Sequence, residues 1–245
     1  MIETREESGV QIIELARADK RNAMLPGMLK SLYDAIASST DALAIAILGQ
    51  GKTFCAGFDL KACANDPSGD TMRSLLTGLS KCVRALRQHP APVVLGVQGA
   101  AVAGGCALLG GADIVVADRH AKLGYPVVKI GVSPAVSSPF MLAAMRPGVV
   151  RTRLLDTDLI SGEHAQRLGM VHELCDDPSG VHDRTIEIAK ALASKPGTGY
   201  RATKQWLNEI CAISEDDANA GLNASLGLTG NEEERERLAA LWGNA

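Results

Sequence analysis

The amino-acid sequence predicts an α/β protein that ends in a helical C-terminal region. Over roughly the first 130 residues, short apolar runs of strand length alternate with segments whose apolar residues recur at helical spacing. Roughly the last 110 residues are dominated by helical patterns. Two glycine-rich stretches, residues 51–60 and 98–108, each follow an apolar run and lead into a helical segment. These observations indicate one large core with a C-terminal appendage, which we divide into residues 1–190 and 191–245.

Composition excludes several classes of function. With 245 residues, 46% of them apolar, the chain can bury a full core. Its 25 basic and 28 acidic residues give a net charge of −3, so there is no positive excess for nucleic acid. Aromatic residues make up only 3%, which argues against platforms that stack bases or sugars. We therefore expect no nucleic-acid partner.

Targeting signals and metal-ligand patterns are not evident either. No apolar run reaches the roughly 18 residues that a membrane span needs, so no membrane partner is expected. The charged first residues lack the apolar core of a signal peptide. Six cysteines are scattered without a CxxC pair or metal-ligand spacing, so we expect a cytoplasmic location, reduced thiols and no metal site.

The first half of the chain supplies the predicted strands and two helices. The strands fall on runs of apolar residues, at residues 9–15, 42–48, 93–97, 113–117 and 122–128. A helix is predicted after Pro26, because proline is tolerated in a first helical turn. Another covers residues 72–88 and is stopped by Pro90. The polar segment 61–70 contains Pro67 and predicts a mobile surface loop.

The second half is predicted to be mostly helical. Helices are expected over residues 137–145, 181–194 and 198–213, with a brief strand at 170–174. Ser161 is typical of a helix N-cap, and Gly169 of the end of that helix. Asn231 followed by three glutamates predicts the start of a final helix that reaches Trp242. That acidic run lacks the ligand alternation of a calcium loop.

The two glycine-rich junctions suggest a binding site. Glycine lets a chain turn tightly and lets a ligand approach the main-chain N–H groups. The first N–H groups of a helix have no partner inside it, and the helix dipole favours negative charge there. Two such junctions facing each other would form a cradle for an oxyanion. The alternative of a nucleotide-phosphate loop fails on spacing, because neither a P-loop nor a GxGxxG motif follows a strand.

Several motifs, in order, resemble the enoyl-CoA hydratase/isomerase (crotonase) superfamily. They are Arg21-Asn-Ala23, Phe54-Cys-Ala-Gly-Phe-Asp-Leu60, Gly99–Gly105, Gly111-Ala-Asp-Ile-Val-Val-Ala117, Gly131-Val-Ser-Pro134, Ile160-Ser-Gly-Glu-His-Ala165 and Leu168-Gly-Met-Val171. The resemblance implies a crotonase-like spiral of ββα units with two nearly perpendicular sheets and a helical C-terminal region. It also implies homotrimers, often paired into dimers of trimers, and an acyl-CoA thioester as ligand, with coenzyme A as part of the substrate and no other cofactor.

The resemblance also assigns site residues. The oxyanion-hole N–H groups would be those of Phe58 and Gly104. The family holds coenzyme A through the segments that here contain Arg21, Ala23, Ala56, Gly57 and Phe58, with Lys61 placed to reach a phosphate. Asp59 is expected to hold the turn at a helix start.

The sequence departs from this family at the proton-handling positions. The two glutamates of the hydratases are replaced by Ala107 and Val127, and the aspartate that some isomerases and dehalogenases carry falls near Ala135. Alkyl groups cannot transfer protons, so a two-glutamate hydration has no acid or base at its usual places. The candidates for a relocated proton carrier are Tyr125, Lys129, Ser133, Ser137, Asp66 and Asp70.

Other reactive residue types are expected to be structural. Cys55 and Cys106 stand at predicted helix starts without a histidine nearby in sequence, which favours packing over nucleophilic catalysis. His89 is predicted to lie on a solvated loop, and the other histidines on the surface. Two functions from different classes remain: enoyl-CoA hydratase/isomerase chemistry with an unidentified proton carrier, or a non-catalytic acyl-CoA binding protein. A subunit that acts only as a scaffold is a third reading and predicts no CoA binding.

Overall fold

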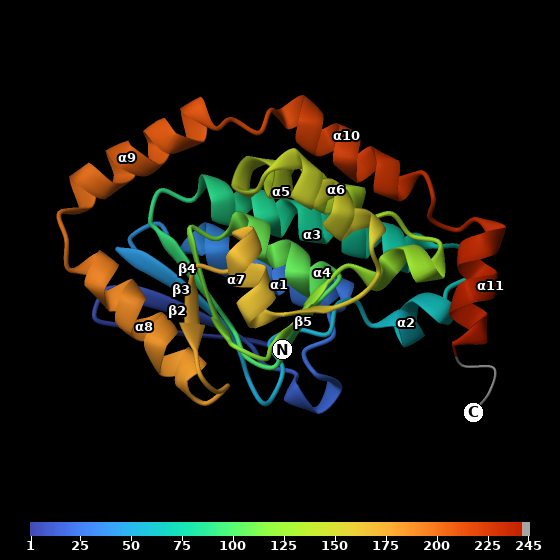
Figure 1. Cartoon of the computed structure of the whole chain (residues 1–245), viewed down its shortest axis with the longest axis horizontal. Coiled ribbons are helices and arrows are strands. Elements are labelled where there is room, and N and C mark those ends of the chain that lie inside the picture. Colours follow the sequence, from blue (N-terminus) through green and yellow to red (C-terminus); the bar gives the residue numbers. More distant parts are fainter. Residues whose placement is uncertain (242–245) are drawn as a thin grey trace.

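Two β-sheets form the framework of the molecule (Figure 1), whose computed structural model describes residues 1–241. The larger sheet has six strands in the order β1-β2-β3-β4-β6-β9. Their bounds are β1 (Ile2–Glu7), β2 (Val10–Leu15), β3 (Ala44–Gly49), β4 (Val93–Val97), β6 (Ile114–Asp118) and β9 (Glu173–Cys175). Only the β1–β2 pair is antiparallel within this sheet. The smaller sheet, ordered β5-β7-β8, consists of β5 (Ala100–Val102), β7 (Lys122–Gly124) and β8 (Ile160–Ser161).

Strand β3 shows why the larger sheet is buried on both faces. All six of its residues are buried. Because successive side chains of a strand point to opposite faces, Ile45 and Ile47 join one apolar cluster, whereas Ala46 and Leu48 join the other. Each large aliphatic side chain buried in this way stabilises the fold by about 1.5–3 kcal/mol. A continuous apolar run is therefore the expected sequence pattern of this strand.

Helices cover both faces of the larger sheet. Helices α1 (Pro26–Ser38) and α3 (Asp70–Gln88) pack against each other on one side, and α8 (Gly180–Ala193) packs against β2, β3, β4 and β6 on the other (Figure 1). Pro26 occupies the first turn of α1, as predicted. The residues that α3 buries recur at three- and four-residue spacing, among them Leu75, Leu79 and Leu86.

Shorter helices connect the two sheets and build the region around the glycine-rich stretches. They are α2 (Leu60–Ala64), α4 (Gly104–Ala107), α5 (Ser138–Ala144), α6 (Pro147–Leu155) and α7 (Gly162–Leu168), together with the 3-10 helices η1 (Ala18–Lys20), η2 (Leu108–Gly111), η3 (Pro126–Ile130) and η4 (Pro134–Ser137). Ser161 caps α7 by accepting a hydrogen bond from the N–H of His164, and Gly169 ends this helix with a left-handed conformation. Both predicted signals of this helix are confirmed.

The C-terminal helices run along the outside of the molecule (Figure 1, orange to red). They are α9 (Gly197–Ile210), α10 (Glu215–Leu226) and α11 (Glu232–Ala240). Helix α9 buries only Lys204, whose ammonium group donates to the Asp113 carboxylate at 2.6 Å and to the Ala91 carbonyl at 2.9 Å. Its Trp206 and Ile210 are 61% and 58% exposed, so α9 presents an apolar face to solvent.

Three predictions from the sequence were wrong, and several elements were not predicted. Residues 61–70 are not wholly a loop, since α2 spans Leu60–Ala64. The predicted strand 122–128 ends at Gly124, because proline at 126 cannot donate to a ladder and begins η3. Strand β1 and helices α6 and α10 were not predicted. His89 is buried rather than solvated, and its Nδ1 accepts from the N–H of Ala91.

The remaining helix predictions fit closely. Helix α11 begins after Asn231, whose side chain accepts from the N–H of Glu234, as the sequence indicated. Its predicted end, Trp242, lies outside the described residues.

No helix within residues 1–241 is both long and apolar enough to span a membrane. The same part of the chain contains no group of side chains that could hold a metal ion.

Candidate functional site

The two glycine-rich stretches lie side by side in space. Cys55 and Ala101 form a parallel bridge, in which the N–H of Cys55 donates to the Ala100 carbonyl at 3.1 Å. The N–H of Val102 donates to the Cys55 carbonyl at 3.0 Å. The main chain therefore fixes residues 54–58 against residues 98–104 before any side chain contributes.

This bridge brings Gly57, Phe58 and Gly104 into contact. A Cβ atom added to Gly57 would lie 3.7 Å from the main-chain nitrogen of Gly104 and 2.9 Å from the Val102 carbonyl oxygen. A Cβ added to Gly104 would lie 2.8 Å from the Phe58 ring. Gly57 also has a φ of +95°, which side-chain-bearing residues rarely adopt. Glycine is therefore required at 57 by both conformation and space, and at 104 by space.

The N–H groups of Phe58 and Gly104 are free to bind a ligand. The N–H of Met24 donates to the Gly57 carbonyl and the N–H of Asp59 donates to the Met24 carbonyl, which leaves the N–H between them unused. Gly104 is the first residue of α4, where a helix has no acceptor for its N–H. Within residues 1–241, neither N–H donates a hydrogen bond.

Ala103, which precedes the second of these N–H groups, is held in an unusual conformation. Its φ is +53° and its ψ is −115°, although alanine carries a Cβ atom. The N–H of Ala103 donates to the Gly124 carbonyl at 2.8 Å, and its carbonyl accepts from the N–H of Ala107 at 2.9 Å. A conformation of this kind costs about 1–3 kcal/mol and persists where surrounding contacts determine it. Here those contacts orient the N–H of Gly104.

The segment Arg21–Met24 runs alongside the first glycine-rich stretch. The N–H of Ala56 donates to the Arg21 carbonyl at 3.0 Å, so the predicted CoA-binding residues of both segments lie together. Asn22 is fully buried and anchors the arrangement, because its amide donates to the carbonyls of Gln50, Thr53 and Phe54. We did not single out Asn22 from the sequence, although it lies inside the motif Arg21–Ala23.

Asp59 holds the start of α2, as predicted. Its carboxylate accepts from the N–H of Ala62 at 3.2 Å and from the Arg17 guanidinium at 2.8 Å. Burial alone would raise the pKa of Asp59, but these hydrogen bonds outweigh burial and hold the pKa below its usual value. Lys61 follows in the same helix and is exposed. The ammonium group of Lys61 makes no hydrogen bond to another residue within residues 1–241.

A cavity of about 260 Å³ opens beside these free N–H groups. Ala56, Phe58, Ala103 and Gly104 line one side of it. The remaining wall is mostly hydrocarbon and comes from α2, α3, β5, η3, η4 and the residue after α11. Its large apolar members are Leu60, Met72, Leu76, Leu79, Val102, Val127, Ile130, Val132, Val136 and Leu241. The cavity thus combines a polar main-chain corner with an apolar chamber.

Both positions at which the family's glutamates are expected face this chamber. Ala107 and Val127 line the cavity, as does η4, the segment that contains Ala135. Among the described residues that form the wall, none carries a carboxylate or an imidazole. The groups there that can exchange a proton are Tyr125, Lys129, Ser133 and Ser137.

The structure places Asp66 and Asp70 away from the cavity wall. Asp66 accepts hydrogen bonds from the hydroxyl of Ser68 at 2.5 Å and from the hydroxyl and N–H of Thr71, both at 2.7 Å. These bonds lower the pKa of Asp66 to about 2. Asp66 is therefore a turn-forming carboxylate, and Asp70 is an exposed residue at the start of α3.

The buried cysteines are packing residues, as predicted. Burial raises the pKa of Cys55 to about 12 and that of Cys106 to about 12 as well. A thiol with such a pKa does not form the nucleophilic thiolate near neutral pH.

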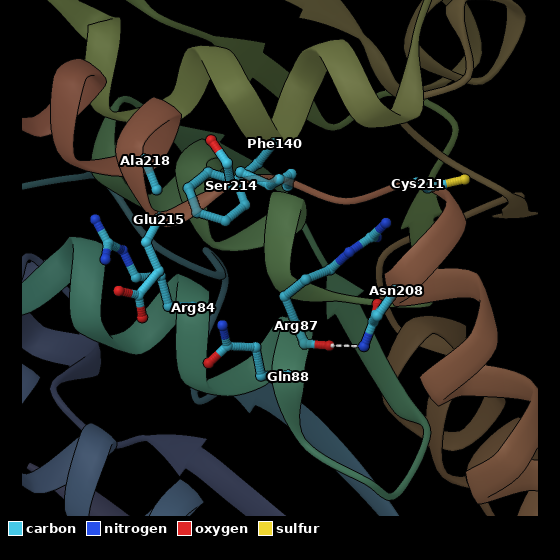
Figure 2. A pocket seen from close by; sticks show the side chains of 10 residues that line it. Arg84, Arg87, Gln88, Phe140, Asn208, Cys211, Ser214, Glu215 and Ala218 are labelled. Carbon is cyan, nitrogen blue, oxygen red and sulfur yellow. Dashed lines mark hydrogen bonds between the residues drawn. The ribbon is translucent and has the colours of Figure 1, made fainter.

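A second hollow lies between α3, α5, α9 and α10 (Figure 2). Its volume is about 90 Å³. The side-chain amide of Asn208 donates to the carbonyl of Arg87 at 3.0 Å. Figure 2 shows this pair together with the side chains of Arg84, Glu215 and Cys211, which also line the hollow. None of the predicted site residues lines this hollow, and opposite charges mix on its wall. The larger cavity is therefore the candidate functional site.

Comparison with known proteins relates the chain to one family. A family model described as enoyl-CoA hydratase/isomerase matches residues 5–236. The chain is 31% identical over 244 residues to a Homo sapiens protein, enoyl-CoA hydratase domain-containing protein 3, mitochondrial, with 91% of this chain and 80% of that one covered. It is 32% identical over 210 residues to the 1,2-epoxyphenylacetyl-CoA isomerase of Escherichia coli, with coverages of 82% and 79%.

Solved structures show the same fold. A crystal structure of an enoyl-CoA hydratase/isomerase from Xanthobacter autotrophicus Py2 superposes with a TM-score of 0.89. The alignment covers 99% of this chain and 93% of that one, at 24% sequence identity. At this identity the likeness establishes the architecture of two sheets and C-terminal helices alone.

Proposed function

Because this chain belongs to the enoyl-CoA hydratase/isomerase family, we propose that it binds an acyl-CoA thioester and polarises the thioester carbonyl. The N–H groups of Phe58 and Gly104 are the proposed donors. The observation that carries the proposal is that both are free within the described chain and that both residues line the apolar cavity.

The chemistry of a thioester explains why such a pair of donors matters. Adding or removing a proton next to the carbonyl places negative charge on the carbonyl oxygen. Main-chain N–H groups that are already fixed stabilise this charge without reorganising, and each contributes on the order of 3 kcal/mol. The bridge between Cys55 and Ala101 supplies this fixed geometry. We propose that the cradle serves hydratase- or isomerase-type chemistry through an enolate.

The wall of the cavity favours a second candidate function. Ala107 and Val127 stand where the family's glutamates are expected, and the wall offers no other carboxylate among its described residues. A protein with this wall can hold and polarise a thioester while lacking a group that transfers a proton at the usual place. The second candidate is therefore an acyl-CoA binding protein that has lost the chemistry.

The coenzyme A moiety and the assembly are also matters of proposal. We place the coenzyme A part along Arg21, Ala23 and Ala56, with the exposed ammonium group of Lys61 toward a phosphate. The apolar face of α9, with Trp206 61% exposed, supports a homotrimer or a dimer of trimers, because an exposed apolar face of this kind is typical of an interface.

Two measurements made in parallel test these proposals. Calorimetric titration with butyryl-CoA and with CoA measures binding, and loss of the enoyl thioester absorbance of crotonyl-CoA measures hydration. Binding together with turnover supports the enzyme. Binding without turnover on straight-chain, branched and 3-enoyl substrates supports the second candidate. No binding of any CoA compound would overturn both and leave a scaffold.

A further inference from the structure

The serines that line or flank the cavity do not all have the same freedom. The hydroxyl of Ser133 accepts from the N–H of Ala135 at 3.2 Å, which caps η4. The hydroxyl of Ser138 donates to the Ala135 carbonyl at 2.7 Å. Ser137 lies between them on the cavity wall, is only 3% exposed, and its hydroxyl makes no hydrogen bond to the main chain within residues 1–241. Of these three serines, Ser137 is therefore the one whose hydroxyl is not engaged with the main chain of η4.

Tyr125 lies beside Ser137 on the same wall. It is 3% exposed, and its hydroxyl neighbours the Ser137 hydroxyl and the Cys106 thiol. Burial, assisted by the neighbouring Cys106, raises the pKa of Tyr125 well above its ordinary value, although Ser137 acts in the opposite direction. The phenol therefore keeps its proton throughout the neutral range. It can therefore donate a hydrogen bond but is not suited to act as a base.

These two hydroxyl groups lie in an otherwise apolar part of the cavity wall. The adjoining wall carries Ala107, Val127 and Val136. A hydrocarbon acyl chain in this chamber would exclude water from both hydroxyls and leave them only each other and the Cys106 thiol as partners. A buried polar group that loses its partner is costly, whereas a ligand oxygen placed against it restores a hydrogen bond.

We propose that Tyr125 and Ser137 form a recognition pair for an oxygen atom on the acyl chain, so that the site prefers hydroxyl- or oxo-substituted acyl-CoA thioesters over hydrocarbon ones. This inference rests on the proposed function, because it assumes that the acyl chain occupies the cavity. It adds the class of substrate, which neither the family nor the pair of free N–H groups determines. The thioester oxygen binds at Phe58 and Gly104, and the second oxygen binds at the Tyr125–Ser137 pair.

The expected preference follows from what one buried hydrogen bond contributes. A hydrogen bond whose loss leaves a buried partner unsatisfied changes an affinity by roughly tenfold to a hundredfold. The oxygen-bearing ligand should therefore bind about tenfold to a hundredfold more tightly than its hydrocarbon counterpart of the same chain length. Removal of the phenol hydroxyl should abolish this ratio rather than weaken both ligands equally.

The test is a calorimetric titration of the full chain with butyryl-CoA, 3-hydroxybutyryl-CoA and 4-hydroxybutyryl-CoA. Two hydroxylated ligands are used because they place the oxygen at different depths. The variants are Tyr125→Phe and Ser137→Ala. Ser138→Ala is the matched control, because it removes a neighbouring hydroxyl that donates to the Ala135 carbonyl and does not line the cavity. Thermal unfolding of each variant shows whether it is folded.

We expect the wild-type protein and Ser138→Ala to prefer at least one hydroxylated ligand, and Tyr125→Phe and Ser137→Ala to bind it no better than butyryl-CoA. Equal affinities for all three ligands in the wild-type protein would overturn the inference and leave the proposed acyl-CoA binding intact. A preference that survives in both variants would also overturn it. No binding of any ligand would overturn the proposed function and the inference with it. If Tyr125→Phe unfolds, the ratio in Ser137→Ala decides.

Discussion

The guanidinium of Arg17 donates to the carboxylate of Asp59 across 2.8 Å, and the same nitrogen donates to the carbonyl of Ala23 at 2.8 Å. Both charged side chains are less than one-fifth exposed. The pair therefore joins the segment that ends at Ala23 to Asp59 at the start of α2. Phe58 lies between these two anchors, because it precedes Asp59 in the chain and forms a bridge with Met24. Because burial weakens competition from water, this ion pair positions the candidate oxyanion donor more firmly than a surface pair would.

Replacing Asp59 with asparagine should destabilise the protein in a pH-dependent manner. Asparagine can still cap α2 but loses the charge that faces Arg17, so we expect a loss of about 1–2 kcal/mol near pH 7. The folded pKa of Asp59 is lowered, so its contribution is present above the unfolded pKa of about 3.9 and is lost as pH falls through the folded value.

Urea unfolding of wild type and Asp59→Asn at pH 7 and at pH 3 measures this difference. Asp34→Asn is the control, because the Lys30–Asp34 pair is exposed and should contribute little. A deficit that stays the same at pH 3 would contradict the assignment, as would an equal deficit in the control.

Replacing Gly57 with alanine should damage both the fold and the proposed binding. The new Cβ would stand 2.9 Å from the Val102 carbonyl oxygen at a φ of +95°, which should cost roughly 1–3 kcal/mol of stability. Displacement of the neighbouring N–H groups should also weaken butyryl-CoA binding at least tenfold, because one such donor contributes on the order of 3 kcal/mol. Thermal unfolding and calorimetric titration measure the two effects.

Gly27 provides the matched control for that substitution. It lies in α1, and a Cβ added there would meet no atom within 4 Å. Gly27→Ala should therefore leave binding unchanged and stabilise the helix by up to about 1 kcal/mol. Normal butyryl-CoA affinity in a folded Gly57→Ala variant would argue against the cradle.

Introducing glutamate at both Ala107 and Val127 should create or greatly increase crotonyl-CoA hydration. Both positions face the cavity, and positioned acids and bases accelerate such reactions by about 10²–10⁴-fold. The absorbance assay measures the rate, and the double glutamine variant separates proton transfer from changes of shape. Hydration by the wild-type protein at the rate of the double glutamate variant would show that a proton carrier is already present.

Glu234 should make stability fall as pH rises. Its side chain is buried at 2% exposure, one carboxyl oxygen accepts from the N–H of Gly230, and the other has no partner within the described chain. Burial raises the pKa of Glu234, against the opposing effects of Gly230 and Arg73. The folded protein therefore holds this proton more tightly than the unfolded chain. Stability is highest below the unfolded pKa of about 4.3 and declines as pH rises through the folded value.

Glu234→Gln should accordingly raise the unfolding temperature at pH 7 and have little effect at pH 4. Glu233→Gln is the control, since Glu233 belongs to an exposed pair with Arg237. A gain of the same size at both pH values would exclude titration of Glu234 as the cause.

Features determined by local chemistry were predicted from the sequence. The caps at Ser161 and Asn231, the proline at the start of α1 and the buried run of β3 depend on residues close together in the chain, and the structure confirms them. Strand β1 was missed because five of its six residues are exposed and its alternation gives no apolar face. An edge strand of charged residues resembles a loop in sequence.

Contacts between segments that are far apart in the sequence could not be predicted from single motifs. The partners of Asn22 lie about 30 residues away, and Tyr125 and Ser137, which precede η3 and end η4, come together on the wall of one cavity. The motif order assigned Phe58 and Gly104 to two junctions, but only the bridge between Cys55 and Ala101 shows that these junctions adjoin.

That bridge separates two properties that an engineer would want to vary independently. The N–H groups of Phe58 and Gly104 lie on segments that this main-chain bridge holds together, whereas much of the chamber wall comes from η3, η4 and Leu241, the residue after α11. A library of variants can therefore exchange side chains on these outer segments without displacing the N–H groups that are proposed to bind the thioester oxygen. The architecture therefore allows the shape of the acyl-chain pocket to be varied while the two candidate N–H donors keep their positions.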